Sequence, residues 1–280
     1  MDTGEKSDSV LVVDIGGTKI AAAVIDAGGN LLGKSRGSTP ESSDAVDLVD
    51  EIERVARLAL DAASMQFDAV PVLGISCAGI VNTREGVVAY SPNVASLRRT
   101  PLRAMLQERF GKPVRLANDA TLAALGEWHF GLKRSVSDLV YVTLSTGIGG
   151  GLICGGVLQE GSCGGGGEVG HMTIEVHGPA CPCGRNGCWE SLASGRALAE
   201  RTVEQLEAGE SSILTDLSGG DMERVDAPLV ALAARQGDRL AQEMVATTAF
   251  YVGVGLGNLI NIFNPALILL GGGLTKIGDP

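Results

Sequence analysis

Basic residues are scarce in this sequence: 22 lysines and arginines stand against 33 aspartates and glutamates, a formal net charge of −11 over 280 residues. Nucleic acids and anionic membrane surfaces are generally bound through basic patches, so this charge balance argues against both partners. No apolar stretch reaches the roughly 20 residues of a transmembrane span. The opening MDTGEKSDSV also lacks the basic start and apolar run of a secretory signal. We therefore expect a soluble cytoplasmic protein with no nucleic acid and no membrane partner.

Two common nucleotide-binding motifs are also missing. The chain has no G-x-x-x-x-G-K-[ST] P-loop, and no G-x-G-x-x-G opens a Rossmann helix. Glycine itself is plentiful, with 40 residues, which is about twice its usual share of roughly 7%. The glycines gather at a few places, which indicates turns and close backbone approach.

A unit of strands and glycine turns follows the polar leader. Apolar runs at Val10–Val13 and Ile20–Ile25 indicate strands, and Gly16-Gly17 between them is a turn signal. Gly28-Gly29 makes a second turn into Leu31-Leu32. We expect three antiparallel strands in this region.

The same order of features recurs about 130 residues later. Leu139–Leu144 indicates a strand, Thr146–Gly151 a turn and Gly155-Gly156 the next turn. The repetition favours two related lobes over a solenoid of short units. Backbone N–H groups at such turns, with hydroxyls from Thr18 and Thr146, would suit the phosphates of a nucleotide. Two ordinary glycine hairpins are an equally good interpretation of this pattern alone.

Helical and strand patterns alternate along the rest of the chain, which predicts an α/β fold. Helical spacing of apolar residues marks 45–65, 102–110, 121–128, 194–206, 227–234 and 240–263, and strand-like runs mark 70–75, 114–117 and 266–270. The last helix contains Gly253, Gly255 and Gly257. We expect these glycines to allow close packing, because each costs about 1 kcal/mol of helix propensity against alanine.

The pair Asn118-Asp119 falls where a strand is expected to meet a helix. Asp119 could cap the helix by accepting from its first free N–H groups. It could equally be a general base at the mouth of a parallel sheet, where ligands tend to bind. The local sequence leaves both interpretations open.

Three cysteines crowd into GPACPCGRNGCWE, where Cys181, Cys183 and Cys188 lie within eight residues. They could bind a metal, form disulfides or remain free. In a reducing cytosol such a cluster is more often a metal site than a set of disulfides. The other cysteines have no such spacing and are expected to be ordinary small residues: Cys77, Cys154 and Cys163.

Five motifs occur in an order that resembles the ROK family of sugar kinases and sugar-responsive repressors. They are DIGGTK (Asp14–Lys19), ANDA (Ala117–Ala120), STGIGGG (Ser145–Gly151), EVGH (Glu168–His171) and CPCGRNGCWE (Cys181–Glu190). Within the family the chain is most similar to the bacterial glucokinases. The resemblance implies a two-lobed, actin-like or hexokinase-type (ribonuclease H-like) α/β fold with duplicated β-hairpin units. We expect an N-terminal lobe at 1–117 and a larger C-terminal lobe with the cysteine loop at 118–280.

The resemblance further implies a hexose kinase that uses ATP, magnesium and a structural zinc ion, with Asp119 as its catalytic base. Its sugar contacts fall on Gly79, Asn93, Asn118, Asp119, Glu168, His171 and Glu190. Its nucleotide contacts fall on Asp14, Gly16, Gly17, Thr18, Lys19, Thr146, Gly147, Gly149 and Gly272. Its zinc ligands fall on His171, Cys181, Cys183 and Cys188. Such a closed four-ligand set is typical of structural zinc.

Glucose, phosphorylated on its 6-hydroxyl, is the expected acceptor. N-acetylmannosamine is the nearest alternative, because GISCAGIVNTREG (Gly74–Gly86) resembles that subgroup at least as much. Other hexoses stay open, as does polyphosphate as the donor. The family likeness also implies a homodimer. A sugar-sensing repressor is disfavoured, because only nine residues precede the first strand and the net charge is −11.

The chain departs from the family pattern at two places. It has Cys77-Ala78 where a proline is usual, and it ends at GGGLTKIGDP, before the usual C-terminal tail of the family. An inactive sugar-binding protein is therefore a third function class, against which the intact Asp119 argues.

Overall fold

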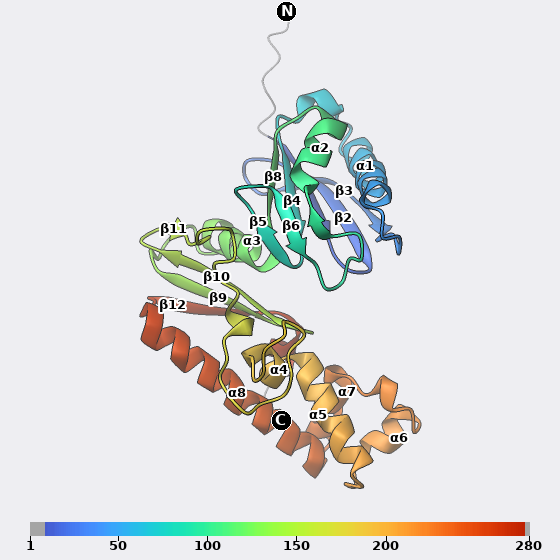
Figure 1. The fold of residues 1–280 in the computed structure, drawn as a ribbon, viewed down its shortest axis with the longest axis vertical. Coiled ribbons are helices and arrows are strands. Elements are labelled where there is room, and N and C mark those ends of the chain that lie inside the picture. The colour runs from blue at the N-terminus through green and yellow to red at the C-terminus, as the bar shows by residue number, and fades with distance from the viewer. Residues whose placement is uncertain (1–8, 278–280) are drawn as a thin grey trace, which may run out of the picture. The chain divides into compact units, whose positions relative to one another are not determined.

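The structure is a computed structural model that describes residues 9–277 and contains two compact units (Figure 1). The first unit runs to Gly131 and includes the segment Glu160–Gly166, and the second comprises Leu132–Gln159 and the chain from Gly167. The lobe boundary expected at residue 117 falls within strand β8 of the first unit.

A five-stranded sheet in the order β3-β2-β1-β4-β8 forms the first unit. The strands are β1 (Val10–Ile15), β2 (Lys19–Ile25), β3 (Leu31–Ser38), β4 (Leu73–Cys77) and β8 (Val114–Asn118). β1, β2 and β3 are antiparallel, which confirms the expected meander, and β4 and β8 join β1 in parallel. Parallel pairing brings the ends of β1, β4 and β8 to one edge of the sheet, where Ile15, Cys77 and Asn118 are in register.

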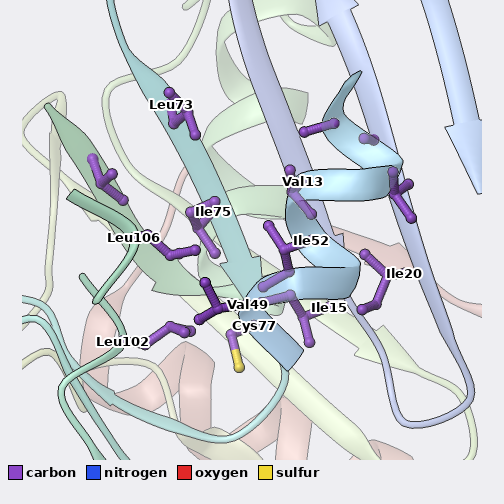
Figure 2. Packing of buried hydrophobic residues seen from close by; sticks show 14 of the residues in the cluster. Val13, Ile15, Ile20, Val49, Ile52, Leu73, Ile75, Cys77, Leu102 and Leu106 are labelled. Carbon is purple, nitrogen blue, oxygen red and sulfur yellow. The ribbon is translucent and has the colours of Figure 1, made fainter. Parts of the chain in front are cut away.

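Two helices pack on this sheet, α1 (Ala45–Ala62) and α2 (Leu102–Phe110). The i, i+3, i+4 spacing of apolar residues in α1 gives it one buried face. Figure 2 shows Val49 and Ile52 of that face among the strand side chains, with Ile75 between them and α2. The core of the first unit therefore lies between the sheet and these helices.

A small antiparallel sheet was not indicated by the sequence. It consists of β5 (Ile80–Asn82), β6 (Val87–Tyr90) and β7 (Arg98–Thr100). Strands of three or four residues, separated by polar turns, are too short to give a clear alternating pattern. This sheet flanks two expected sugar contacts, because Gly79 precedes β5 and Asn93 lies between β6 and β7.

The sheet of the second unit repeats the strand order of the first, β11-β10-β9-β12 against β3-β2-β1-β4. Its strands are β9 (Leu139–Leu144), β10 (Ile148–Cys154), β11 (Val157–Leu158) and β12 (Leu267–Gly271). The first three are antiparallel and β12 joins β9 in parallel. A long helix precedes the parallel strand in both units, α1 before β4 and α8 (Arg239–Phe263) before β12. The expected internal repeat is therefore confirmed in strand order and direction.

The turn expected at Thr146–Gly151 is shorter in the structure, because β10 already begins at Ile148. Gly149, Gly150 and Gly151 pair with β9 as strand residues. The missing side chain of Gly150 serves packing: a Cβ there would lie 2.7 Å from Cγ2 of Val169 and 3.1 Å from the carbonyl oxygen of Gly167.

Helices form the rest of the second unit. They are α4 (Trp189–Ala193), α5 (Gly195–Glu207), α6 (Leu214–Ser218), α7 (Ala227–Arg235) and α8. By length and composition alone α8 could cross a membrane, with a mean hydropathy of 1.4 over 18 residues. It packs against α4, α5 and α7, and it contributes Val245 and Leu259 to two buried clusters. Only 22% of its apolar window is buried, so α8 packs on the unit along one face and leaves Phe250 and Ile262 exposed.

Candidate functional site

The expected site residues form two sets, one in each unit. The set in the first unit lies at the ends of β1, β4 and β8 and in nearby turns: Asp14, Gly16, Gly17, Thr18, Lys19, Gly79, Asn93, Asn118 and Asp119. The set in the second unit comprises the residues around the β9–β10 turn, the cysteine loop and the end of β12: Thr146, Gly147, Gly149, Glu168, His171, Cys181, Cys183, Cys188, Glu190 and Gly272.

The β1–β2 turn of the first unit is closed and tightly packed. Gly16 N donates to the carbonyl of Lys19 at 3.0 Å, and the Thr39 hydroxyl donates to the carbonyl of Gly16 at 2.7 Å. A Cβ at Gly17 would lie 2.6 Å from Cβ of Asn93, so the turn has room only for glycine there. Thr18 and Lys19 are exposed at the tip of the turn.

Asn118 and Asp119 divide the two roles that the sequence left open. Asn118 is the cap of α3 (Asp119–Gly126), because its Oδ1 accepts from Thr121 N at 3.1 Å. Its Nδ2 donates to the carbonyl of Gly79 at 3.0 Å, which joins two expected sugar contacts. Asp119 is the first residue of the helix, and its Oδ1 accepts from the adjacent Ala120 N at 2.9 Å. The cap interpretation of Asp119 is therefore wrong.

The environment of Asp119 favours its protonated form. Burial raises the pKa of the Asp119 carboxyl above its ordinary value, and the negative charge of Asp14 adds to the rise. The hydrogen bond from Ala120 N opposes it. Cys77 lies at the same sheet edge, where burial, Asp119 and Asp14 raise the pKa of its thiol to about 12. Cys77 therefore stays an uncharged, buried thiol, as expected of an ordinary small residue.

The β9–β10 turn of the second unit is held by a carboxylate from α4. Ile148 N donates to Oε2 of Glu190 at 2.9 Å, and a Cβ at Gly147 would lie only 2.5 Å from that oxygen. Oε1 of Glu190 accepts from Nη2 of Arg196 at 3.2 Å. Both carboxylate oxygens of Glu190, an expected sugar contact, therefore accept hydrogen bonds. Oε2 accepts from the turn backbone and Oε1 accepts from the Arg196 guanidinium.

A cavity of about 710 Å³ lies beside this turn, within the second unit. Its lining includes Ser145 and Thr146 of the turn and three cations, Arg196, Arg235 and Lys276. A cavity of this volume suits a small organic ligand, and hydroxyls with cations suit phosphates. Sequence reasoning missed the three cations, because they come from α5, α7 and the end of the described chain and form no local motif.

Three expected nucleotide contacts of the second unit do not line this cavity: Gly147, Gly149 and Gly272. Gly272 has φ +93°, and a Cβ there would meet the carbonyl oxygen of Leu144 at 2.2 Å, whereas the neighbouring Gly273 is a lining residue. Gly149 is a strand residue paired with Thr143.

The cysteine loop brings four possible metal ligands together. The ligand atoms of His171, Cys181, Cys183 and Cys188 all lie within 4.8 Å of one another. Cys181 Sγ is 3.6 Å from His171 Nδ1, and Cys183 Sγ is 3.6 Å from Cys188 Sγ. With zinc bond lengths of about 2.3 Å to sulfur and about 2.0 Å to nitrogen, a tetrahedron has edges of roughly 3.5–3.8 Å. The two 3.6 Å separations match the edges of such a tetrahedron, and every described cysteine is a free thiol.

The cluster is anchored to the interior of the unit. Trp189, directly after Cys188, is fully buried and donates from Nε1 to the carbonyl of Tyr251 in α8 at 2.9 Å. Cys188 also precedes Glu190 by two residues, so the loop, the anchor and the carboxylate belong to one continuous segment. Order in the cysteine loop therefore fixes the position of Glu190.

The two hairpin sheets define an α/β protein of the actin-like, hexokinase-type class, the fold of the solved ROK hexokinases that it matches. The profile of the ROK family matches residues 10–279. The chain belongs to the ROK family.

Relatives of known activity cover most of the chain. A glucokinase from Streptomyces coelicolor is 38% identical over 269 residues, which are 95% of this chain and 82% of the relative. An N-acetylmannosamine kinase from Escherichia coli is 36% identical over 243 residues, 86% of this chain and 79% of the relative. The crystal structure of a ROK family glucokinase from Streptomyces griseus in complex with glucose and AMPPNP superimposes with a TM-score of 0.81 at 36% identity, covering 97% of this chain and 85% of that one.

Proposed function

We propose that this protein is an ATP-dependent hexose kinase that transfers the γ-phosphate of ATP to the 6-hydroxyl of glucose. The observation that carries the proposal is Asp119, a carboxyl directly after β8 that does not cap α3 and whose pKa is raised, in a chain of the ROK family. The glucokinases at 38% and 35% identity support glucose as the acceptor.

Asp119 acts as the general base in this proposal. It accepts the proton of the 6-hydroxyl while the hydroxyl oxygen attacks the γ-phosphorus, and ADP leaves on the opposite side. A carboxylate with an ordinary pKa near 4 is a weak base for an alcohol. Its raised pKa makes it a stronger base, and in a loose transition state the proton is transferred late.

The donor occupies the 710 Å³ cavity of the second unit in this proposal. Thr146 and the cations Arg196, Arg235 and Lys276 would meet its phosphates. The AMPPNP bound to the Streptomyces griseus glucokinase supports ATP as the donor. Magnesium would neutralise phosphate charge when bound, with Asp14 as the carboxylate offered by the exposed β1–β2 turn region.

The sugar contacts proposed for the second unit depend on the cysteine loop. We assign a structural zinc ion to His171, Cys181, Cys183 and Cys188, on the basis of their donor types and spacing. Coordination through Nδ1 leaves Nε2 of His171 free to hydrogen-bond a sugar hydroxyl. Glu168 and Glu190 supply carboxylates, and Asn118, Gly79 and Asn93 are the contacts proposed for the first unit. The same family likeness supports a cytoplasmic homodimer.

N-acetylmannosamine is the second candidate acceptor. The Escherichia coli N-acetylmannosamine kinase is nearly as similar as the glucokinases, at 36% identity. The two substrates share the 6-hydroxyl, so the roles of Asp119 and the donor cavity would be unchanged. Only the surroundings of the sugar C2 position would differ.

The test is ADP release by the purified chain with magnesium ATP across a sugar panel. The panel includes glucose, N-acetylmannosamine and 6-deoxyglucose, which has no 6-hydroxyl. We expect the highest kcat/KM with glucose and no release above background with 6-deoxyglucose. Preference for N-acetylmannosamine would replace the substrate and keep the mechanism. No sugar-dependent release by folded, zinc-loaded protein would overturn the kinase assignment.

A further inference from the structure

Arg196 stands between the donor cavity and the carboxylate of Glu190. Its side chain is 38% exposed and lines the cavity, whereas Glu190 is 18% exposed and is absent from the lining. The guanidinium of Arg196 donates from Nη2 to Oε1 of Glu190 at 3.2 Å. One cation thus contacts both the space assigned to the donor and a residue assigned to the sugar.

The backbone holds Arg196 at this place. Gly195 N donates to the carbonyl of Ser145 at 2.7 Å, and Arg196 N donates to the carbonyl of Thr146 at 3.2 Å. These bonds tie the start of α5 to the β9–β10 turn. The other ion pair of the side chain among the described residues is a long and exposed one, with Nε 3.8 Å from the carboxylate of Glu200. The guanidinium can therefore turn between partners while its backbone stays fixed.

The two oxygens of Glu190 differ in how firmly they are held. Oε2 accepts from the backbone N–H of Ile148 at 2.9 Å, a donor that is fixed by the β9–β10 hairpin. Within the described part of the chain, Oε1 accepts its one hydrogen bond from Arg196, whose side chain is 38% exposed. A phosphate group in the cavity is a strong competitor for that guanidinium, because arginine binds phosphate with charge-assisted hydrogen bonds.

We infer that Arg196 is a positioning residue that couples donor binding to sugar binding. With the cavity empty, the guanidinium of Arg196 donates a hydrogen bond to Oε1 of Glu190. When donor phosphates enter, they draw the guanidinium away and leave Oε1 free to accept from a sugar hydroxyl. This inference rests on the proposed function, since it requires a phosphate donor in the cavity and a sugar at Glu190. It predicts positive coupling that is reciprocal between the two ligands.

The experiment measures glucose affinity by titration calorimetry with and without saturating magnesium AMPPNP. For the wild-type chain we expect AMPPNP to lower the glucose Kd by about 5-fold or more, the usual range of coupling between sites. Arg196→Met keeps a long apolar stem without the charge. In this variant we expect glucose to bind at least as tightly as to the wild type without AMPPNP, and the coupling factor to fall to about 1.

Arg235→Met is the matched control. Arg235 lines the same cavity, and its Nη1 donates to the carbonyl of Ile277 at 3.1 Å and not to Glu190. Its loss should weaken AMPPNP itself but keep the wild-type coupling factor. An unchanged factor in Arg196→Met, or an equal loss in both variants, would overturn the role of Arg196. Binding without coupling in the wild type overturns this inference alone, whereas no binding of either ligand overturns the proposed function with it.

Discussion

Gly255 is the point at which α8 meets the indole of Trp189. A Cβ at Gly255 would lie 2.0 Å from Cε2 and 2.4 Å from Cδ2 of that ring, against about 3.5–4.0 Å for an ordinary carbon contact. Trp189 is fully buried and hydrogen-bonded to Tyr251, so the ring has no free space to enter. Overpacking costs about 1–3 kcal/mol, and alanine recovers about 0.5–1 kcal/mol of helix propensity.

We therefore predict that Gly255→Ala lowers the free energy of unfolding of the second unit by about 1–2 kcal/mol. Gly253→Ala is the control, because no atom lies within 4 Å of a Cβ there, and it should stabilise the helix by about 0.5–1 kcal/mol. Urea unfolding followed by circular dichroism and tryptophan fluorescence measures both. Since Trp189 lies between Cys188 and Glu190, Gly255→Ala should also lower kcat/KM. Equal stability of the two variants would refute the packing argument.

The other predictions concern the carboxylates and the cysteine loop. Asp14→Asn removes a like charge that raises the pKa of Asp119, so the acid limb of the kcat/KM profile should move to lower pH; a limb that stays in place or moves up would contradict the charge effect. Gly147→Ala would place a methyl group 2.5 Å from Glu190 Oε2, and we expect kcat/KM to fall by about 10–100-fold. The control is Gly126→Ala, where no atom lies within 4 Å of the added Cβ, and its kcat/KM should be near that of the wild type. Cys183→Ser should lose the bound zinc and lower the Tm of the second unit. Cys163→Ser, whose sulfur lies outside the cluster, should keep the zinc and the wild-type Tm. Metal analysis and calorimetry measure the two effects, and equal zinc content in the two variants would refute the site.

Regular elements could be predicted from the sequence where one face is apolar over several turns. The expected α2 coincides with Leu102–Phe110, because its buried residues recur every four positions on one face. The expected β9 coincides with Leu139–Leu144, because a strand buried on both faces is a short continuous apolar run. The start of β10 could not be predicted, because its glycines carry no side-chain pattern, and Gly150 serves close packing against Val169. Of the three glycines in α8, only Gly255 meets another side chain within 4 Å, and the sequence gives no sign of which one does.

The site was predictable where residues form a local motif. Neighbouring members of the His171 and cysteine cluster are ten residues or fewer apart in sequence. The three cysteines alone favoured a metal over disulfides, and the family resemblance added His171. The division of roles between Asn118 and Asp119 could not be predicted, because either side chain can cap a helix. Arg196 was missed because its partner Glu190 lies six residues earlier, across the break between α4 and α5. A separation of six residues does not place Arg196 and Glu190 on the same face of a helix, so no sequence pattern joins them.

The most direct test of the account is the turnover of Asp119→Asn with glucose and magnesium ATP. Asparagine keeps the size of the side chain and cannot accept the proton, so kcat should fall by about 10²–10⁴-fold. Glucose binding, measured by calorimetry, should stay within a few-fold of the wild type, because the cap at Asn118 and its bond to Gly79 do not involve Asp119. A kcat close to that of the wild type, in a variant that still binds glucose, would contradict the assignment of Asp119 as the base.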